Sequence, residues 1–156
     1  MTNTQMSAEK QGQLVPELIN IVNTQIVKCN IDCPFDFSLD NVQGHEHNLE
    51  FDMAFNLNDA MVKADFKLKV TTKSKDDVET EATGDFHFVY IFNVENLQEL
   101  AIPNANKEIV LHGGLGNALA SISYSTSRGM LFARLKGTGL ENFMLPVIDP
   151  NSLLKH

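Results

Sequence analysis

Alternation of apolar and polar side chains limits the possible folds of this chain more than any other feature. Apolar residues recur at every second position over residues 49–57 and 62–70, and, with gaps, over residues 78–94. A period of two is typical of β-strands that bury one face. Polar residues at 58–59 and 73–77 mark short turns between the three runs. This part of the chain is therefore predicted to form an antiparallel meander.

A fourth and weaker run precedes the meander. Its apolar positions keep one phase over residues 19–33, interrupted at Asn23 and Gln25, and Pro34 ends it. The irregular residues 34–47 that follow are too many for a tight hairpin. We therefore expect a crossover loop that places this first strand beside the strand at residues 78–94.

The apolar period becomes helical in the second half of the chain. Apolar residues recur at helical spacing from about residue 107 to residue 136, and Gly137 marks an end. The predicted fold class is α+β: a four-stranded antiparallel sheet, with a crossover loop between strands one and two, followed by a long helix. Residues 1–17 are predicted to form a flexible N-terminal tail, and residues 18–156 a single domain.

The charge balance excludes two classes of partner. The chain of 156 residues has 12 Lys and Arg against 20 Asp and Glu, which gives a net charge of −8. Binding to nucleic acid or to an anionic membrane needs a basic surface, so we expect neither as a partner. No signal peptide is visible, and no apolar stretch is long enough to span a membrane. A cytoplasmic location is predicted.

Two cysteines, Cys29 and Cys33, fall on the first predicted strand. Four residues of extended chain separate their Cα atoms by ~13 Å, at ~3.3 Å per residue. That distance is too long for a disulfide between them. We expect two buried, reduced thiols.

Catalytic and metal-binding motifs are weak throughout the sequence. His45 and His47 form a pair without a third ligand at metal-binding spacing. His87 lies near Asp85 on the polar phase of its strand, but no nucleophile motif accompanies them. Gly113-Gly-Leu-Gly116 matches no phosphate-binding fingerprint, so close backbone packing or a helix bend is expected there. The sequence predicts no enzyme, no metal and no cofactor.

Two irregular segments are unusually apolar. Phe35, Phe37 and Leu39 alternate in the predicted crossover loop. A second stretch lies at residues 140–148 and contains Leu140, Phe143, Leu145, Val147 and Ile148. Because loops usually run over the surface, such segments either offer an apolar patch to a partner or plug the core or an oligomer interface. Both interpretations stay open.

Several local motifs, taken in order, resemble the SecB family of protein-export chaperones. Lys28-Cys-Asn-Ile-Asp32-Cys-Pro34 resembles the end of the family's first strand, and Ile91-Phe-Asn-Val94 the end of its fourth. Ser125-Thr-Ser-Arg128, Gly137-Thr138 and Leu145-Pro-Val147 resemble its long helix and the proline segment after it. No single motif is specific, but the ordered set covers most of the chain.

The resemblance spans about residues 18–154 and implies a function. It implies a homotetramer, a dimer of dimers, that binds unfolded preproteins in apolar grooves without ATP and passes them to the SecA motor. The peptide-binding residues would then be Phe35, Phe37, Leu39, Leu140, Phe143, Leu145, Val147 and Ile148. Asp32 and Asp85 match two acidic SecA-contact positions, whereas Lys28 stands at a third.

Three alternatives accompany this hypothesis. The lysine at position 28 and the short segment at residues 152–156 also fit a SecB-like chaperone with a dedicated client, such as an antitoxin. A small-molecule-binding α+β domain would instead depend on a closed pocket, with His87 as its candidate polar group. A structural oligomer would use the apolar segments as interface and would have no chaperone role.

Overall fold

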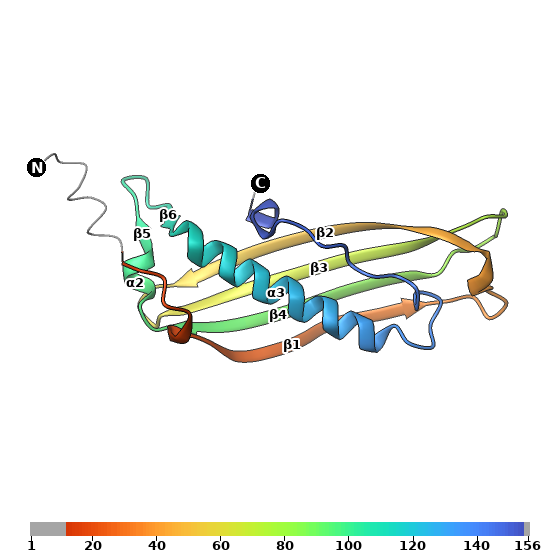
Figure 1. Cartoon of the computed structure of the whole chain (residues 1–156), viewed down its shortest axis with the longest axis horizontal. Helices are drawn as coiled ribbons and strands as arrows, with labels where there is room; N and C mark the ends of the chain where they lie inside the picture. The colour runs from red at the N-terminus through yellow and green to blue at the C-terminus, as the bar shows by residue number, and fades with distance from the viewer. Residues whose placement is uncertain (1–11, 155–156) are drawn as a thin grey trace, which may run out of the picture.

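Residues 12–154 are described by the computed structural model. They form an antiparallel four-stranded sheet with one long helix lying across one of its faces (Figure 1). The strands are β1 (Ile19–Asp32), β2 (Val42–Asn56), β3 (Met61–Ser74) and β4 (Thr83–Val94), and the helix is α3 (Gly113–Arg134). The strand order is β1-β4-β3-β2. The α+β class is confirmed, and so is the crossover, which carries the chain from β1 at one edge to β2 at the other.

The core lies between α3 and the sheet face that carries the predicted apolar phase. Cross-strand pairing sets Phe66 opposite Phe88, and their rings stack with centroids 5.9 Å apart. Burying one large apolar side chain contributes about 1.5–3 kcal/mol, so this layer is the main source of stability. Its fully buried members include Val62, Ala64, Phe66, Leu68, Phe86, Phe88, Tyr90, Phe92, Leu115 and Leu119.

Small hydroxyl side chains on α3 are buried without being left unpaired. The hydroxyl groups of Tyr90 and Ser127 are hydrogen-bonded at 2.6 Å, and Ser123 donates to the carbonyl of Leu119 at 2.8 Å. A buried hydroxyl without a partner costs about 1–3 kcal/mol, so these bonds allow a serine-rich helix to face an aromatic sheet.

Helix α3 begins at Gly113, which corrects the predicted start near residue 107. The side chain of Asn104 accepts two backbone N–H groups of the segment that follows it, and Lys107 takes a left-handed conformation with φ 62°. These features turn the chain into a hairpin of β5 (Ala101–Pro103) and β6 (Ile109–Leu111), which follows the single turn α2 (Leu97–Leu100). Apolar spacing alone does not reveal such a turn.

Close packing explains one of the glycines at the start of α3. His112 caps the helix, since its Nδ1 accepts the N–H groups of Gly114 and Leu115 at 3.1 and 3.3 Å. A Cβ on Gly116 would lie 3.0 Å from Leu154 Cδ1, in the short helix η3 (Pro150–Leu154). The close packing expected of this segment is thus found at Gly116, whereas a Cβ on Gly113 would meet open space.

Strand β2 begins at Val42, well before the predicted start near residue 48. β3 continues to Ser74 and supplies pairing partners for these earlier residues. His45 and His47 therefore lie on a strand rather than in the crossover loop. The crossover loop shortens to residues 33–41 and contains the short helix η2 (Leu39–Asn41).

Strand β4 begins at Thr83, not at residue 78 as predicted. The carboxylate of Glu81 accepts hydrogen bonds from the hydroxyl groups of Thr72 and Ser74 at 2.6 and 3.0 Å. These contacts tie the segment before β4 to β3 through side chains instead of through a regular ladder. The hydrogen bond from Thr72 also lowers the pKa of Glu81.

Strand β1 is an exposed edge. Among residues 12–154 it pairs only with β4, and two register shifts, after Ile21 and after Ile26, interrupt the pairing. Ile21, Val22 and Val27 are all exposed, although strands of this kind usually blunt a free edge with charge.

The two cysteines are free, but only one is shielded from solvent. Cys29 is half-buried on β1, whereas Cys33 is exposed. The prediction of two buried thiols is met only in part at Cys29 and is wrong for Cys33, because β1 ends at Asp32 and Cys33 opens the crossover loop.

Part of the predicted N-terminal tail packs on the body of the protein. The backbone N–H of Gly12 donates to Glu99, and the side chain of Asn96 donates to the carbonyl of Gln13. The short helix η1 (Pro16–Leu18) then leads into β1. Residues 1–11 of that tail lie outside the described residues. Within residues 12–154, no helix is both long and apolar enough to cross a membrane.

Candidate functional site

The two apolar segments of the sequence meet at one end of the sheet. The crossover loop (residues 33–41) packs against the post-helix segment, defined as residues 137–149. A Cβ on Gly139 would come within 2.6 Å of Cys33 Sγ and 2.8 Å of Ala82 Cβ, so only glycine permits this approach. Phe37 lies in the same contact, 3.3 Å from that position. The fold thus brings together two segments that are about a hundred residues apart in the chain.

Phe143 anchors the post-helix segment on the inner face of β2. Its ring lies against the rings of His45 and His47, with centroids 5.4 and 5.5 Å apart. Phe143, Leu140 and Leu145 are buried in the core. These three predicted peptide-binding residues therefore present no surface to a peptide in this arrangement. Figure 1 shows the segment returning from the end of α3 across the sheet toward β2.

The other predicted peptide-binding residues keep accessible surface. Phe35 and Val147 are the most exposed, at 108% and 85% of the reference area. Phe37, Leu39 and Ile148 are half-buried. The exposed apolar surface therefore lies on the crossover loop and on the outer side of the post-helix segment.

Side-chain contacts from α3 hold the second half of the post-helix segment, residues 143–149, against the helix. The hydroxyl of Tyr124 donates to the carbonyl of Pro146, and the Arg128 guanidinium donates to Met144 Sδ at 3.5 Å. Burial raises the pKa of Tyr124, so the hydroxyl stays a donor. Met144 and Val147 remain exposed beside these contacts.

A second apolar hollow is not predicted from the sequence. It has a volume of about 390 Å³ and lies between β2, β6, the start of α3 and η3. The alternation over β2 indicates one wall of this hollow, but the apolar spacing over residues 109–111 is also helical and η3 has only five residues. Its apolar lining consists of Phe51, Met53, Phe55, Ile109, Leu111, Leu153 and Leu154.

His45 is a poorly solvated imidazole at the base of the post-helix segment. β2 places it opposite Thr72, and its Nε2 atom is buried with no hydrogen-bond partner among residues 12–154. Desolvation by burial lowers the pKa of His45 below the ordinary 6.5. The folded chain therefore holds this side chain neutral.

Acidification is expected to destabilise the fold through His45. The unfolded chain binds a proton near pH 6.5, while the folded chain resists protonation. Stability is therefore complete above that pH and falls as the pH drops through it toward the lower pKa of the folded state. Urea midpoints measured between about pH 7.5 and about pH 5.5 test this, since carboxylates with ordinary pKa values stay ionised there. His45→Gln should flatten the dependence; equal slopes for wild type and His45→Gln would contradict the assignment.

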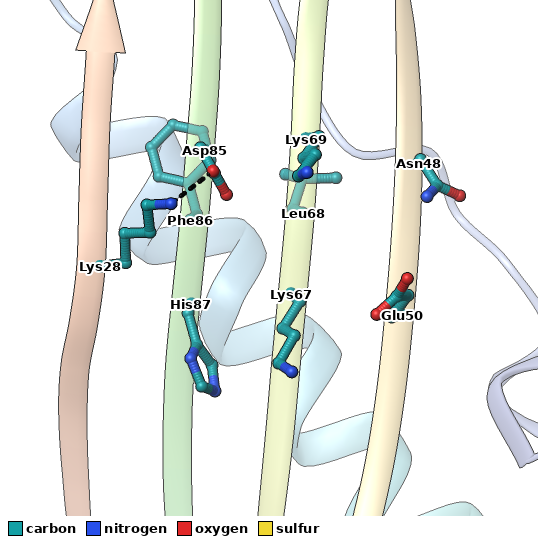
Figure 2. A pocket seen from close by; sticks show the side chains of 9 residues that line it. All are labelled: Lys28, Asn48, Glu50, Lys67, Leu68, Lys69, Asp85, Phe86 and His87. Atoms are coloured by element: carbon teal, nitrogen blue, oxygen red, sulfur yellow. Dashed lines mark hydrogen bonds and ion pairs between the residues drawn. The ribbon is translucent and has the colours of Figure 1, made fainter.

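The outer face of the sheet carries the two acidic positions implied by the resemblance. Asp32 is exposed opposite Thr83, and Asp85 lies opposite Asn30. Lys28 Nζ lies 2.7 Å from Asp85 Oδ2, so one of the two carboxylates is already in an ion pair (Figure 2).

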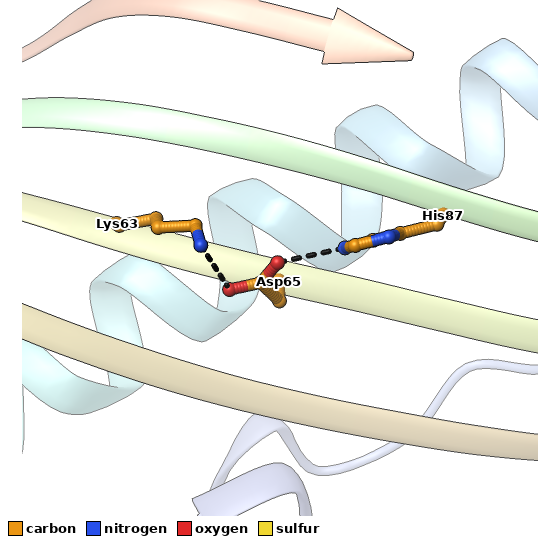
Figure 3. A network of polar contacts seen from close by, with 3 residues as sticks. All are labelled: Lys63, Asp65 and His87. Carbon is orange, nitrogen blue, oxygen red and sulfur yellow. Dashed lines mark hydrogen bonds and ion pairs between the residues drawn. The ribbon is translucent and has the colours of Figure 1, made fainter. Parts of the chain in front are cut away.

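His87 does not pair with its neighbour Asp85. Its Nε2 lies 2.7 Å from Asp65 Oδ1, on the adjacent strand β3, and Lys63 Nζ lies 3.4 Å from the other oxygen of Asp65 (Figure 3). The three groups form an ordinary surface network across two strands. No group of three or more His, Cys, Asp or Glu side chains in the described part of the chain could hold a metal ion.

One solved structure shares this arrangement of strands and helix. The SecB-like chaperone Rv1957 of Mycobacterium tuberculosis, in complex with a ChAD peptide from the Rv1956 HigA1 antitoxin, aligns with a TM-score of 0.61 and 11% identity. The alignment covers 83% of this chain and 90% of that one. This chain has a SecB-like fold.

Other comparisons add little. A protein of unknown function from Streptococcus agalactiae aligns at 11% identity over 83% of this chain and 97% of that one, with a TM-score of 0.35. No family model matches the sequence, and no curated protein matches it. The SecB-like fold agrees with the order of elements on which the resemblance was based.

Proposed function

We propose that this protein is a cytoplasmic, ATP-independent holdase, a binding protein rather than an enzyme, that binds extended apolar segments of an unfolded client. The observation that carries the proposal is the exposure of Phe35 and Val147, at 108% and 85%, on the segments that meet beside α3. Exposed apolar side chains that gather on one surface mark a binding site for a partner, whereas single ones are common. A client that binds only when unfolded would be kept unfolded by mass action alone, without ATP.

A dedicated client is favoured over general delivery of preproteins to SecA. The structural neighbour holds an antitoxin peptide, and this chain has the same fold. SecA docking by resemblance would need free acidic groups on the outer face of the sheet. Asp32 and Asp85 do share that face, but Lys28 neutralises Asp85. Delivery to SecA remains the second candidate, supported by Asp32 alone.

Assembly as a homotetramer is part of the proposal. The free edge of β1, with Ile21, Val22 and Val27 exposed, offers a surface that a second copy would cover. Four copies would carry a charge of 4 × −8 = −32, from the −8 of one chain. Such a charge helps to keep exposed apolar surface soluble.

Aggregation of a diluted, chemically unfolded client tests the holdase directly. We expect this protein, without ATP and at about one tetramer per client, to suppress the light scattering of the client. Multi-angle light scattering on the same sample gives the mass of the assembly. A stable tetramer that neither suppresses scattering nor binds unfolded client would favour a purely structural oligomer. That result would contradict the holdase proposal.

A further inference from the structure

A basic hollow lies on the face of the sheet opposite α3 (Figure 2). It has a volume of about 330 Å³ and crosses all four strands. Lys28 comes from β1, Lys67 and Lys69 from β3, and His87 from β4. Asn48 and Glu50 close it on the β2 side. Three lysines therefore gather at one site on a chain whose net charge is −8.

Two of the three lysines, Lys67 and Lys69, form no ion pair within residues 12–154, although Lys67 stands directly opposite Glu50 on β2. Lys28 is bound to Asp85 at 2.7 Å. Lys69 has Asp85 and the neutral Asn48 as its cross-strand neighbours, so the nearest acid is already engaged. Within residues 12–154, neither Lys67 nor Lys69 takes part in an ion pair of 4.0 Å or less.

The spacing of these two lysines is that of an extended peptide. Lys67 and Lys69 lie two residues apart on the same side of β3, which separates their Cα atoms by ~6.6 Å. Side chains two residues apart in an extended segment have the same spacing. A segment lying along β3 would thus bring one carboxylate to each lysine. The side-chain amide of Asn48, opposite Lys69, would then donate to the carboxylate bound by Lys69.

We propose that this hollow binds an extended acidic segment of a partner protein, with carboxylates at alternate positions. Charged and polar side chains dominate the lining of the hollow, unlike the mostly apolar lining of small-molecule pockets. Charge complementarity favours carboxylates, and the like charges of Lys67 and Lys69 are relieved when such a segment binds. Two acids line the hollow: Asp85 is bound to Lys28, so Glu50, opposite Lys67, is the acid that opposes the occupant. The site lies on the opposite face of the sheet from Phe143 and the core, and does not depend on the chaperone function.

Fluorescence anisotropy with a labelled peptide tests the site on the full-length protein. The probe alternates Glu and Thr, and two controls carry Gln in place of Glu or the same number of Glu in one block. We expect the alternating Glu peptide to bind tightest at low ionic strength, where the Debye length is ~30 Å at ~10 mM salt. Tight binding of the Gln peptide would overturn the proposal, and equal binding of the block peptide would overturn the alternate spacing.

Matched lysine variants locate the binding. Lys67→Gln with Lys69→Gln should weaken binding roughly tenfold, the effect of losing two exposed ion pairs. Lys75→Gln with Lys107→Gln makes the same change in charge elsewhere and should leave binding unchanged. Glu50→Gln should tighten it. Equal weakening by the two double variants would show that the peptide senses only net charge, and would reject the site. All these side chains are exposed, so circular dichroism should show unchanged folding.

Discussion

Phe143→Ala is expected to lower the free energy of unfolding by about 3–5 kcal/mol, the usual range for removing a buried phenylalanine. The ring is 7% exposed and lies against His45 and His47, so its loss detaches the post-helix segment from β2. Phe35→Ala is the matched control, because both residues belong to the apolar segments singled out by sequence. Phe35 is fully exposed, so its removal should change stability by no more than about 0.5 kcal/mol.

Urea denaturation of the two variants measures this difference. The slope of free energy against urea should be unchanged in Phe35→Ala, because the core remains intact. Similar losses of stability in both variants would mean that Phe35 is covered in the assembled protein, and that the crossover loop is an interface rather than a free surface. Wild-type stability in both variants would mean that the post-helix segment is not part of the core.

The sheet could be predicted from sequence because its signal is periodic. Alternation over residues 49–57 and 62–70 fixed which side chains of β2 and β3 face inward, and Phe51, Phe66 and Leu68 are buried as that phase requires. The length of the crossover then placed β1 beside β4 without any knowledge of side-chain contacts. Local pattern and chain connectivity were sufficient for both.

The post-helix segment could not be predicted in the same way. Its apolar residues follow no period, so sequence could not separate the buried Phe143 from the exposed Val147. That difference depends on His45 and His47, which face inward only because β2 begins at Val42. The start of β2 depends in turn on β3 continuing to Ser74, a long-range pairing without local signature.

The outer face shows the same limit for charged residues. Sequence placed Asp32, Asp85 and Lys28 on one face, and the pairing of β1 with β4 confirms this. It could not show which acid each cation would meet. His87 binds Asp65, its diagonal neighbour on β3, whereas Asp85 is already paired with Lys28 on β1.

Replacing both exposed apolar residues should remove most of the affinity for an unfolded client. Phe35→Asp with Val147→Asp takes away two side chains that a bound client would bury, each worth about 1.5 kcal/mol or more. The expected loss is about 3 kcal/mol, roughly 100-fold in affinity. Both side chains are exposed, so stability and assembly should not change. Val15→Asp with Val110→Asp, two exposed positions away from both segments, adds the same charge and should bind as wild type does.

The most direct test of the account is the affinity of these proteins for a labelled, permanently unfolded client, measured by anisotropy without ATP. We expect tight binding by the wild type and by the Val15 and Val110 variant, and roughly 100-fold weaker binding by the Phe35 and Val147 variant, as the loss of two buried side chains requires. Wild-type affinity in the Phe35 and Val147 variant, with its assembly intact, would contradict the claim that these segments hold the client.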